Sequence, residues 1–156
     1  MNTLIRLATE NDCSQLCLLS EQYNKVILRN RPQVDKSNLL GNGPNFFLQI
    51  LKNKGEVIFV AERVNKIIGF IYAAIETHSD DLASAPYIEI ALLIVDESYR
   101  HSGIGGSLIK RIHDWAIKKG IKVIHLAVHE FNNYAIAFYQ KMGYKTVMRK
   151  MERILE

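Results

Sequence analysis

Residues 87–106, YIEIALLIVDESYRHSGIGG, decide the fold of this 156-residue chain. Tyr87–Val95 is an apolar run of strand length, rich in β-branched residues, and Glu89 is its one charged residue. The polar residues that follow end the run. Apolar residues then recur at helical spacing from Ser107 to about Lys119, with charged residues between them. The sequence therefore predicts a buried strand, a glycine-rich turn and an amphipathic helix.

The turn has features of a phosphate-binding loop. Gly103, Gly105 and Gly106 leave the backbone accessible and permit the dihedrals that a tight turn requires. The first amides of the following helix are unpaired and lie at the positive end of its dipole, which favours an anionic phosphate. The spacing of the glycines alone is equally compatible with a compact structural turn that binds no ligand. The stretch lacks the Gly-Lys-Ser/Thr of a Walker loop and the glycine spacing of a dinucleotide fingerprint.

Two motifs resemble the GNAT superfamily of acyl-CoA-dependent N-acetyltransferases. Residues 100–105, RHSGIG, match that family's Arg/Gln-x-x-Gly-x-Gly/Ala signature. Residues 132–144, NNYAIAFYQKMGY, are similar to its Asn-x-x-Ala…Tyr-x-x-x-Gly-Phe/Tyr block. The two motifs stand in the family's order with a predicted strand between them. The resemblance covers residues 87–156 strongly and the first half of the chain only in the order of its elements.

The resemblance implies an α/β fold with a mixed, mostly antiparallel sheet flanked by helices, whose central parallel strand pair splays apart around the coenzyme. It implies acetyl-CoA as co-substrate, with the pyrophosphate on the amides of residues 100–106 and the pantetheine amides on strand backbone. Asn132 has two roles open to it, as a helix cap and as a coenzyme contact. The implied coenzyme contacts are Leu93, Ile94, Val95, Arg100, His101, Ser102, Gly103, Ile104, Gly105, Gly106, Asn132 and Tyr139.

Two residues are candidates for the acid–base chemistry of direct acetyl transfer, which needs no enzyme nucleophile. Tyr139 stands at the family's thiolate-proton-donor position, although an aromatic residue on a short helix also commonly packs in a core. Glu89, eleven residues before Arg100, corresponds to the glutamate base of some members, and burial would raise its pKa. Alternatively, Glu89 points to solvent, and water or another residue is the base. The other candidate bases are Glu76, His78, Asp80 and Asp81.

Composition and charge narrow the classes of partner. A chain of 156 residues that is 48% hydrophobic and 23% charged suits one soluble globular domain, residues 1–156. The net charge of +4 suits an acidic small molecule, but the basic residues are too dispersed for nucleic acid. We expect a cytoplasmic protein without a membrane partner, since no signal peptide or membrane-length apolar run is evident. Cys13 and Cys17 lack the second ligand pair of a zinc site, His125 and His129 lack a third ligand, and no metal is expected.

The remaining elements follow from periodicity and turn residues. A Thr9–Asp12 capping box predicts a helix to about Leu28, and Val64 and Asn65 predict a hairpin turn. Residues 29–44 form a polar connection, which in the resembled family lies beside the acceptor site. The predicted strands are residues 3–7, 57–63, 66–76, 122–128 and 144–154. Residues 45–52 and 133–142 are predicted to be short helices, and residues 77–86 a polar loop.

Three functions remain open on the sequence. The leading one is an N-acetyltransferase acting on a primary amine, whose acceptor is a small amine, an amino acid derivative, an antibiotic amine or a protein amine. The second is a non-catalytic acyl-CoA-binding or interaction module of the same fold. The third, a nucleotide-dependent phosphotransferase, is disfavoured by the missing Lys-Ser/Thr. A homodimer is common among the proteins that the chain resembles, but the sequence reveals no interface.

Overall fold

The computed structural model describes residues 2–41, 43–77 and 85–155. Its strands are β1 (Leu4–Leu7), β2 (Glu56–Arg63), β3 (Lys66–Glu76), β4 (Tyr87–Val95) and β5 (Ile124–Leu126). Its α-helices are α1 (Cys13–Asn30), α2 (Pro44–Lys52), α3 (Ile104–Lys119) and α4 (Asn133–Lys141). Short 3-10 helices cover Glu10–Asp12, Lys36–Asn38 and Glu97–Tyr99. Within these described ranges, no helix is long and apolar enough to cross a membrane.

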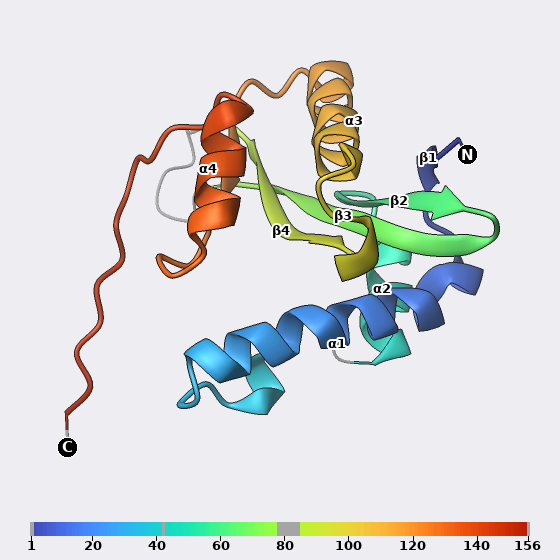
Figure 1. Cartoon of the computed structure of the whole chain (residues 1–156). Helices are drawn as coiled ribbons and strands as arrows, with labels where there is room; N and C mark the ends of the chain where they lie inside the picture. The colour runs from blue at the N-terminus through green and yellow to red at the C-terminus, as the bar shows by residue number, and fades with distance from the viewer. Residues whose placement is uncertain (1, 42, 78–84, 156) are drawn as a thin grey trace.

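The five strands form one mixed sheet in the order β1-β2-β3-β4-β5, of which Figure 1 labels β1 to β4. Neighbouring strands are antiparallel except β4 and β5, which are parallel because α3 crosses over between them. The predicted mixed sheet is confirmed. The β2–β3 hairpin turns at Val64 (φ 50°) and Asn65 (φ 59°), the pair of positive φ angles that a tight two-residue hairpin turn requires.

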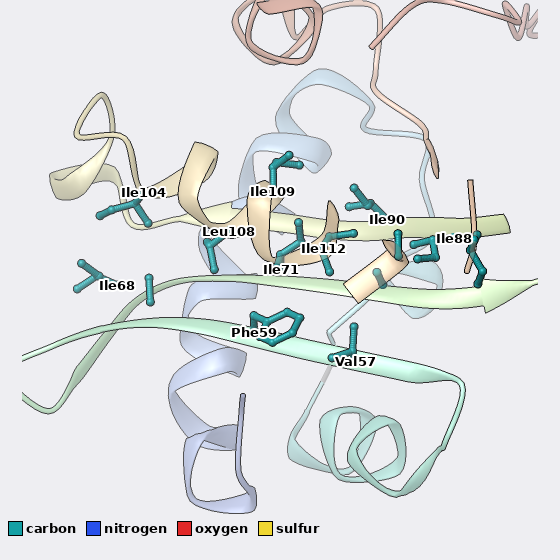
Figure 2. Close-up of a cluster of buried hydrophobic side chains, with 14 residues drawn as sticks. Val57, Phe59, Ile68, Ile71, Ile88, Ile90, Ile104, Leu108, Ile109 and Ile112 are labelled. Atoms are coloured by element: carbon teal, nitrogen blue, oxygen red, sulfur yellow. The ribbon is translucent and has the colours of Figure 1, made fainter. Parts of the chain in front are cut away.

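Apolar clusters fill both faces of the sheet. In Figure 1, α3 lies over one face, and α1 and α2 lie over the other. Figure 2 shows the cluster on the α3 face, where Ile71 of β3 and Leu108 of α3 are fully buried. On the opposite face, the ring of Phe47 from α2 meets Phe70 of β3 edge to face at 5.6 Å. The central strand β3 is therefore covered on both sides, which explains its continuous apolar sequence.

A β-bulge in β4 changes which face its side chains meet. The β3–β4 register shifts between Tyr72 and Ala73 of β3, which leaves Ala91 as the extra residue of β4. Ile90, before the bulge, packs in the cluster on the α3 face, whereas Leu92 packs in the cluster on the α1 face. The bulge also separates the strand into two halves, one containing Glu89 and one leading into the glycine-rich turn.

Three expectations about the second half of the chain were wrong in extent or in kind. The helix begins at Ile104 rather than Ser107, so two of the turn's glycines lie in its first helical turn. Strand β5 is three residues long rather than seven, because only these residues pair with β4. The predicted strand over residues 144–154 is absent. Residues 145–155 have no regular secondary structure, because this segment runs away from the sheet and pairs with none of its strands (Figure 1).

Candidate active site

The turn between β4 and α3 is fixed by local hydrogen bonds. The buried Asp96 carboxylate accepts the N–H of Ser98 at 2.9 Å and lies 3.5 Å from Lys66 Nζ. Burial would raise the pKa of Asp96, but the Ser98 amide and Lys66 together hold that pKa below its ordinary value. His101 (φ 62°) and Gly103 (φ 82°) then adopt left-handed backbone conformations, which direct the chain into α3.

Two glycines keep space free around the first turn of α3. A Cβ atom on Gly103 would meet nothing within 4 Å, so the space beside this residue is open. A Cβ atom on Gly105 would lie 3.3 Å from Cζ of Phe138, so Gly105 lets α4 pack closely against α3. The first amides of a helix have no partner within the helix and lie at the positive end of its dipole. The open space at Gly103 is thus suited to an anionic group such as a phosphate.

Helix α4 starts beside this turn and is capped there. The Asn132 side-chain oxygen accepts the N–H of Ala135 at 3.1 Å, which confirms its expected capping role. The Tyr134 hydroxyl lies 3.2 Å from Nδ1 of His101, and the two rings meet edge to face at 4.9 Å. Sequence reasoning missed Tyr134 and Phe138 as elements of the turn's surroundings. Their positions within the Asn-x-x-Ala block were the only signal.

The edge of β4 that faces β5 is unpaired near the turn. Pairing between β4 and β5 ends where Ile90 stands opposite Leu126, whereas β4 continues to Val95 with β3 on its other side. Along the rest of β4, the described residues provide no strand on the β5 side. Backbone groups of Leu93 to Val95 on that edge are therefore available to an extended ligand, apart from the Val95 carbonyl oxygen, which accepts a hydrogen bond from Arg100.

The Arg100 side chain is directed back toward the strand rather than over the turn. Its Nε donates to the carbonyl oxygen of Val95 at 3.3 Å, and its Nη2 lies 3.8 Å from a Glu97 carboxylate oxygen. The Ser102 hydroxyl likewise donates to the carbonyl oxygen of Tyr99. Both side chains therefore stabilise the backbone of the turn in this structure.

Tyr139 is surrounded by other aromatic residues on α4 and near it. Its ring lies 5.2 Å from that of Phe138 and 5.8 Å from that of Tyr144. Burial raises the pKa of Tyr139, and the Tyr144 and Tyr23 hydroxyls add to this effect. The phenol therefore keeps its proton at neutral pH. Tyr139 also packs against the cluster on the α3 face, which includes Ile104 and Leu108 of α3.

Glu89 belongs to a row of residues that crosses the sheet. The strand registers pair Glu56 of β2 with Ala74, Ala74 with Glu89, and Glu89 with His125 of β5. Side chains of paired residues project from the same face of a sheet. Glu89 is half-buried, and burial raises its pKa, with His125 lowering that pKa and Glu76 raising it further. We call these residues, Glu56, Ala74, Glu89 and His125, the transverse row.

The transverse row places two carboxylates on one face with only a small side chain between them. Glu56 also accepts a hydrogen bond from the Tyr72 hydroxyl. The sequence singled out Glu89 but missed Glu56, because the register that aligns the two strands leaves no local signal. The alternate Glu76 ends β3 opposite Tyr87. The other alternates, His78, Asp80 and Asp81, lie outside the described residues.

A cleft of about 220 Å³ lies between α1, the α1–α2 connection and the segment after β5. The buried Oδ1 atom of Asn24 in this cleft has no hydrogen-bond partner among the described residues. Burial lowers the pKa of His129, and the Arg31 cation lowers it further. Tyr23, which lines the cleft, also contributes to the raised pKa of Tyr139. Its lining is Tyr23, Asn24, Ile27, Arg31, Val34, Leu39, Leu40 and His129.

Metal binding gains no support from the described side chains. Among them, no group of three or more His, Cys, Asp or Glu residues is arranged to hold a metal ion. His125 lies in the transverse row and its ring is 4.7 Å from that of Tyr87, whereas His129 lies in the cleft and stacks on Phe131 at 5.2 Å. The two histidines therefore have different neighbours.

Comparisons with known proteins identify relatives of this chain in sequence and in fold. The sequence of residues 28–144 matches the acetyltransferase (GNAT) family. An acetyltransferase of Pectobacterium atrosepticum is 29% identical over 143 residues, which are 92% of this chain and 88% of that protein. The fold resembles the BH1408 protein of Bacillus halodurans, solved as a tetramutant, with a TM-score of 0.88 and 24% identity over 97% of this chain and 99% of that one. It also resembles AAC(6')-Iy in complex with the bisubstrate analog CoA-S-monomethyl-acetylneamine, with a TM-score of 0.77 and 19% identity over 100% of this chain and 99% of that one.

Proposed function

Because the chain belongs to the GNAT family of acetyltransferases, we propose that it moves an acetyl group from acetyl-CoA to a primary amine by direct attack. The observation that carries this proposal is the β4–α3 turn. Open space at Gly103 lies beside the unpaired first-turn amides of α3, next to an unpaired edge of β4. This combination suits a ligand that joins a pyrophosphate to an extended amide-bearing arm. The bisubstrate analog bound by AAC(6')-Iy contains CoA, which supports the same ligand here.

The coenzyme contacts divide between the turn and the strand. Backbone amides of residues 100–106 are proposed to bind the pyrophosphate, and backbone groups of residues 93–95 to pair with the pantetheine arm. Arg100 contributes mainly through its backbone, because its side chain already donates to Val95. Asn132 caps the N-terminus of α4, which lies beside the β4–α3 turn. Its second proposed role is a direct contact with the coenzyme.

Two side chains are proposed to move protons during the transfer. The thioester of acetyl-CoA supplies the acetyl group, and the amine nitrogen forms the new C–N bond as the C–S bond breaks. Glu89 accepts the proton that the amine loses, directly or through one water, and its raised pKa makes it a stronger base than an ordinary glutamate. Tyr139 donates its proton to the departing sulfur and regains one from solvent. The products are an N-acetyl amine and CoA.

The charges on the α1 face favour a cationic acceptor. Glu56 and Glu89 of the transverse row flank Ala74, and Glu76 is close enough to raise the pKa of Glu89. Such a group of carboxylates attracts an ammonium ion before it is deprotonated. The cleft beside Tyr23 offers a largely apolar wall to the rest of the acceptor. We therefore propose a cationic amine acceptor.

The test is a panel of amines assayed for release of the CoA thiol, with mass spectrometry to detect the acetylated product. The panel contains a polyamine, an aminoglycoside, an amino acid amide and peptides with a free N-terminus or a lysine. We expect turnover with at least one cationic member and a lower rate after Glu56→Gln. Firm CoA binding without turnover of any amine would instead favour a non-catalytic acyl-CoA-binding module.

A further inference from the structure

His101 has a backbone conformation that is unusual for a residue with a side chain. Its φ angle is 62°, in the left-handed region, and two positions later Gly103 has a φ of 82°. Glycine adopts such angles freely, but a Cβ atom makes them sterically unfavourable. A residue other than glycine keeps this conformation only where its surroundings enforce it, and such residues often lie at ligand sites. A contact of His101 must therefore compensate for the strain.

The residues on either side of His101 do not supply that contact. Arg100 Nε donates to the carbonyl oxygen of Val95, five positions earlier, and the Ser102 hydroxyl donates to that of Tyr99, three positions earlier. Both bonds hold the turn against the segment that leads into it, and neither involves His101. The contact described for the His101 ring comes instead from another helix.

Tyr134 of α4 contacts the His101 ring in two ways. Its hydroxyl lies 3.2 Å from Nδ1 of His101, and the two rings meet edge to face with their centroids 4.9 Å apart. Tyr134 lies in the first turn of α4, and the Asn132 cap fixes the start of this helix. Tyr134 is 56% exposed and lies outside both apolar clusters. Its contact with His101 thus links the turn to α4 without a role in the core.

We propose that Tyr134 is a positioning residue for the coenzyme, which holds His101 in the left-handed conformation before the coenzyme binds. The left-handed residues His101 and Gly103 together direct the chain through the turn, so they determine where its amides point. This role rests on the proposed function, since the amides that Tyr134 keeps in place are those of residues 100–106. A turn that is ordered in advance does not lose binding free energy to its own ordering.

The effect of Tyr134 falls on binding rather than on the chemical step. In a protein whose turn is ordered only part of the time, the apparent dissociation constant rises in inverse proportion to the ordered fraction. Bound phosphate then keeps the turn ordered, because the ligand favours the conformation that binds it. Loss of the Tyr134 side chain should therefore raise KM for acetyl-CoA and leave kcat unchanged.

The first experiment measures the His101 backbone by NMR in the absence of any ligand. Tyr134→Ala removes both the hydroxyl and the ring, and it should fold because alanine favours a helix and the position is exposed. The coupling constants and chemical shifts of His101 should report a positive φ in the native protein and an average over several conformations in Tyr134→Ala. An unchanged φ in Tyr134→Ala would overturn the proposal.

His113→Ala is the matched control for this experiment. It removes a second contact between a histidine and a tyrosine, in which Nε2 of His113 lies 3.0 Å from the Tyr144 hydroxyl. Because that contact does not involve the turn, the His101 signals should keep their native values. A change in the His101 φ as large as that in Tyr134→Ala would mean that any loss on the helices disturbs the turn, and would refute a specific role of Tyr134.

A double-mutant cycle with CoA tests whether Tyr134 acts through His101. Tyr134→Ala should raise the dissociation constant of CoA about 5- to 10-fold, whereas kcat at saturating acetyl-CoA should change less than about twofold. In a His101→Gly background, glycine adopts the left-handed φ without strain, so Tyr134→Ala should change the dissociation constant less than about twofold. An equal effect in both backgrounds would mean that Tyr134 contacts the coenzyme itself, and would refute the positioning role.

The outcomes separate this role from the proposed function. A native protein that binds no CoA would overturn both. Native and Tyr134→Ala proteins that bind CoA equally tightly would overturn only the positioning role. Circular dichroism establishes that each variant is folded before its dissociation constant is compared.

Discussion

Replacing Gly103 with glutamate tests whether the turn binds a phosphate. The structure separates two effects of this change. A Cβ atom at this position meets nothing within 4 Å, so added bulk clashes with no protein atom. The φ angle of 82° lies in the left-handed region, where a side chain costs about 1 kcal/mol. The Gly103→Glu protein should therefore fold, with its main defect in binding anions.

The expected loss of coenzyme affinity follows from Coulomb's law. A carboxylate about 6 Å from each of two phosphate charges, at an effective dielectric constant of about 40, is destabilising by about 1.4 kcal/mol per charge. The sum, about 3 kcal/mol, corresponds to a roughly 100-fold increase in the dissociation constant of CoA. Added salt should reduce the difference, because screening weakens exposed charges.

Gly103→Asn is the matched control, since asparagine tolerates the left-handed conformation and adds bulk without charge. Isothermal titration calorimetry with CoA should give a dissociation constant for Gly103→Asn much closer to that of the native protein than to that of Gly103→Glu. If Gly103→Glu and Gly103→Asn bind CoA equally well, the negative charge has no effect. The phosphate would then lie elsewhere.

Three further predictions concern the proton-transfer residues and the packing of the sheet. Tyr139→Phe should lower kcat about 100-fold and change the dissociation constant of acetyl-CoA by less than about twofold, because only the proton donor is lost. Tyr144→Phe, which removes a neighbouring hydroxyl, is the control. Equal values of kcat for the two variants would mean that Tyr139 has only a packing role. Burial raises the pKa of Glu89 above the ordinary 4.5. As the pH drops through that raised pKa, the carboxylate becomes protonated and kcat/KM should fall. If kcat/KM of Glu89→Gln falls at the same acidic pH, another group is responsible for the decrease. Gly69→Ala should lower the free energy of unfolding in urea by about 2 kcal/mol, since the added Cβ would lie 2.9 Å from the Ile94 carbonyl oxygen. Gly55→Ala is the control, because its Cβ would meet nothing within 4 Å. It should change the free energy of unfolding by less than about 0.5 kcal/mol. Equal unfolding midpoints for the two alanine variants would contradict this account of Gly69.

Local chemistry made much of the fold predictable from sequence. The β2–β3 turn was identified because asparagine tolerates the positive φ that Asn65 adopts. The cap of α4 at Asn132 was identified for a similar reason, since its side chain bonds the helix's own backbone. The start of α3 was placed three residues late, because Gly105 and Gly106 have low helix propensity but are required by packing and space around the turn.

Features that depend on distant segments could not be predicted from sequence. Glu56 lies in the transverse row with Glu89 only because two strand registers align them across Ala74. The cleft joins Tyr23 of α1 to His129, which follows β5, and no local pattern links them. Residues 144–154 have a composition suited to a strand, but a strand forms only by pairing with another strand, and this segment pairs with none in the described sheet.

Calorimetric titration of the native protein with CoA, acetyl-CoA and Mg-ATP shows whether the turn and the edge of β4 bind acyl-CoA. We expect micromolar dissociation constants for both CoA forms, because the turn binds the pyrophosphate and the edge of β4 binds the pantetheine arm. Mg-ATP lacks that arm and should bind at least 10-fold more weakly. Binding of Mg-ATP alone, or of none of the three, would contradict the assignment of this turn and strand to acyl-CoA.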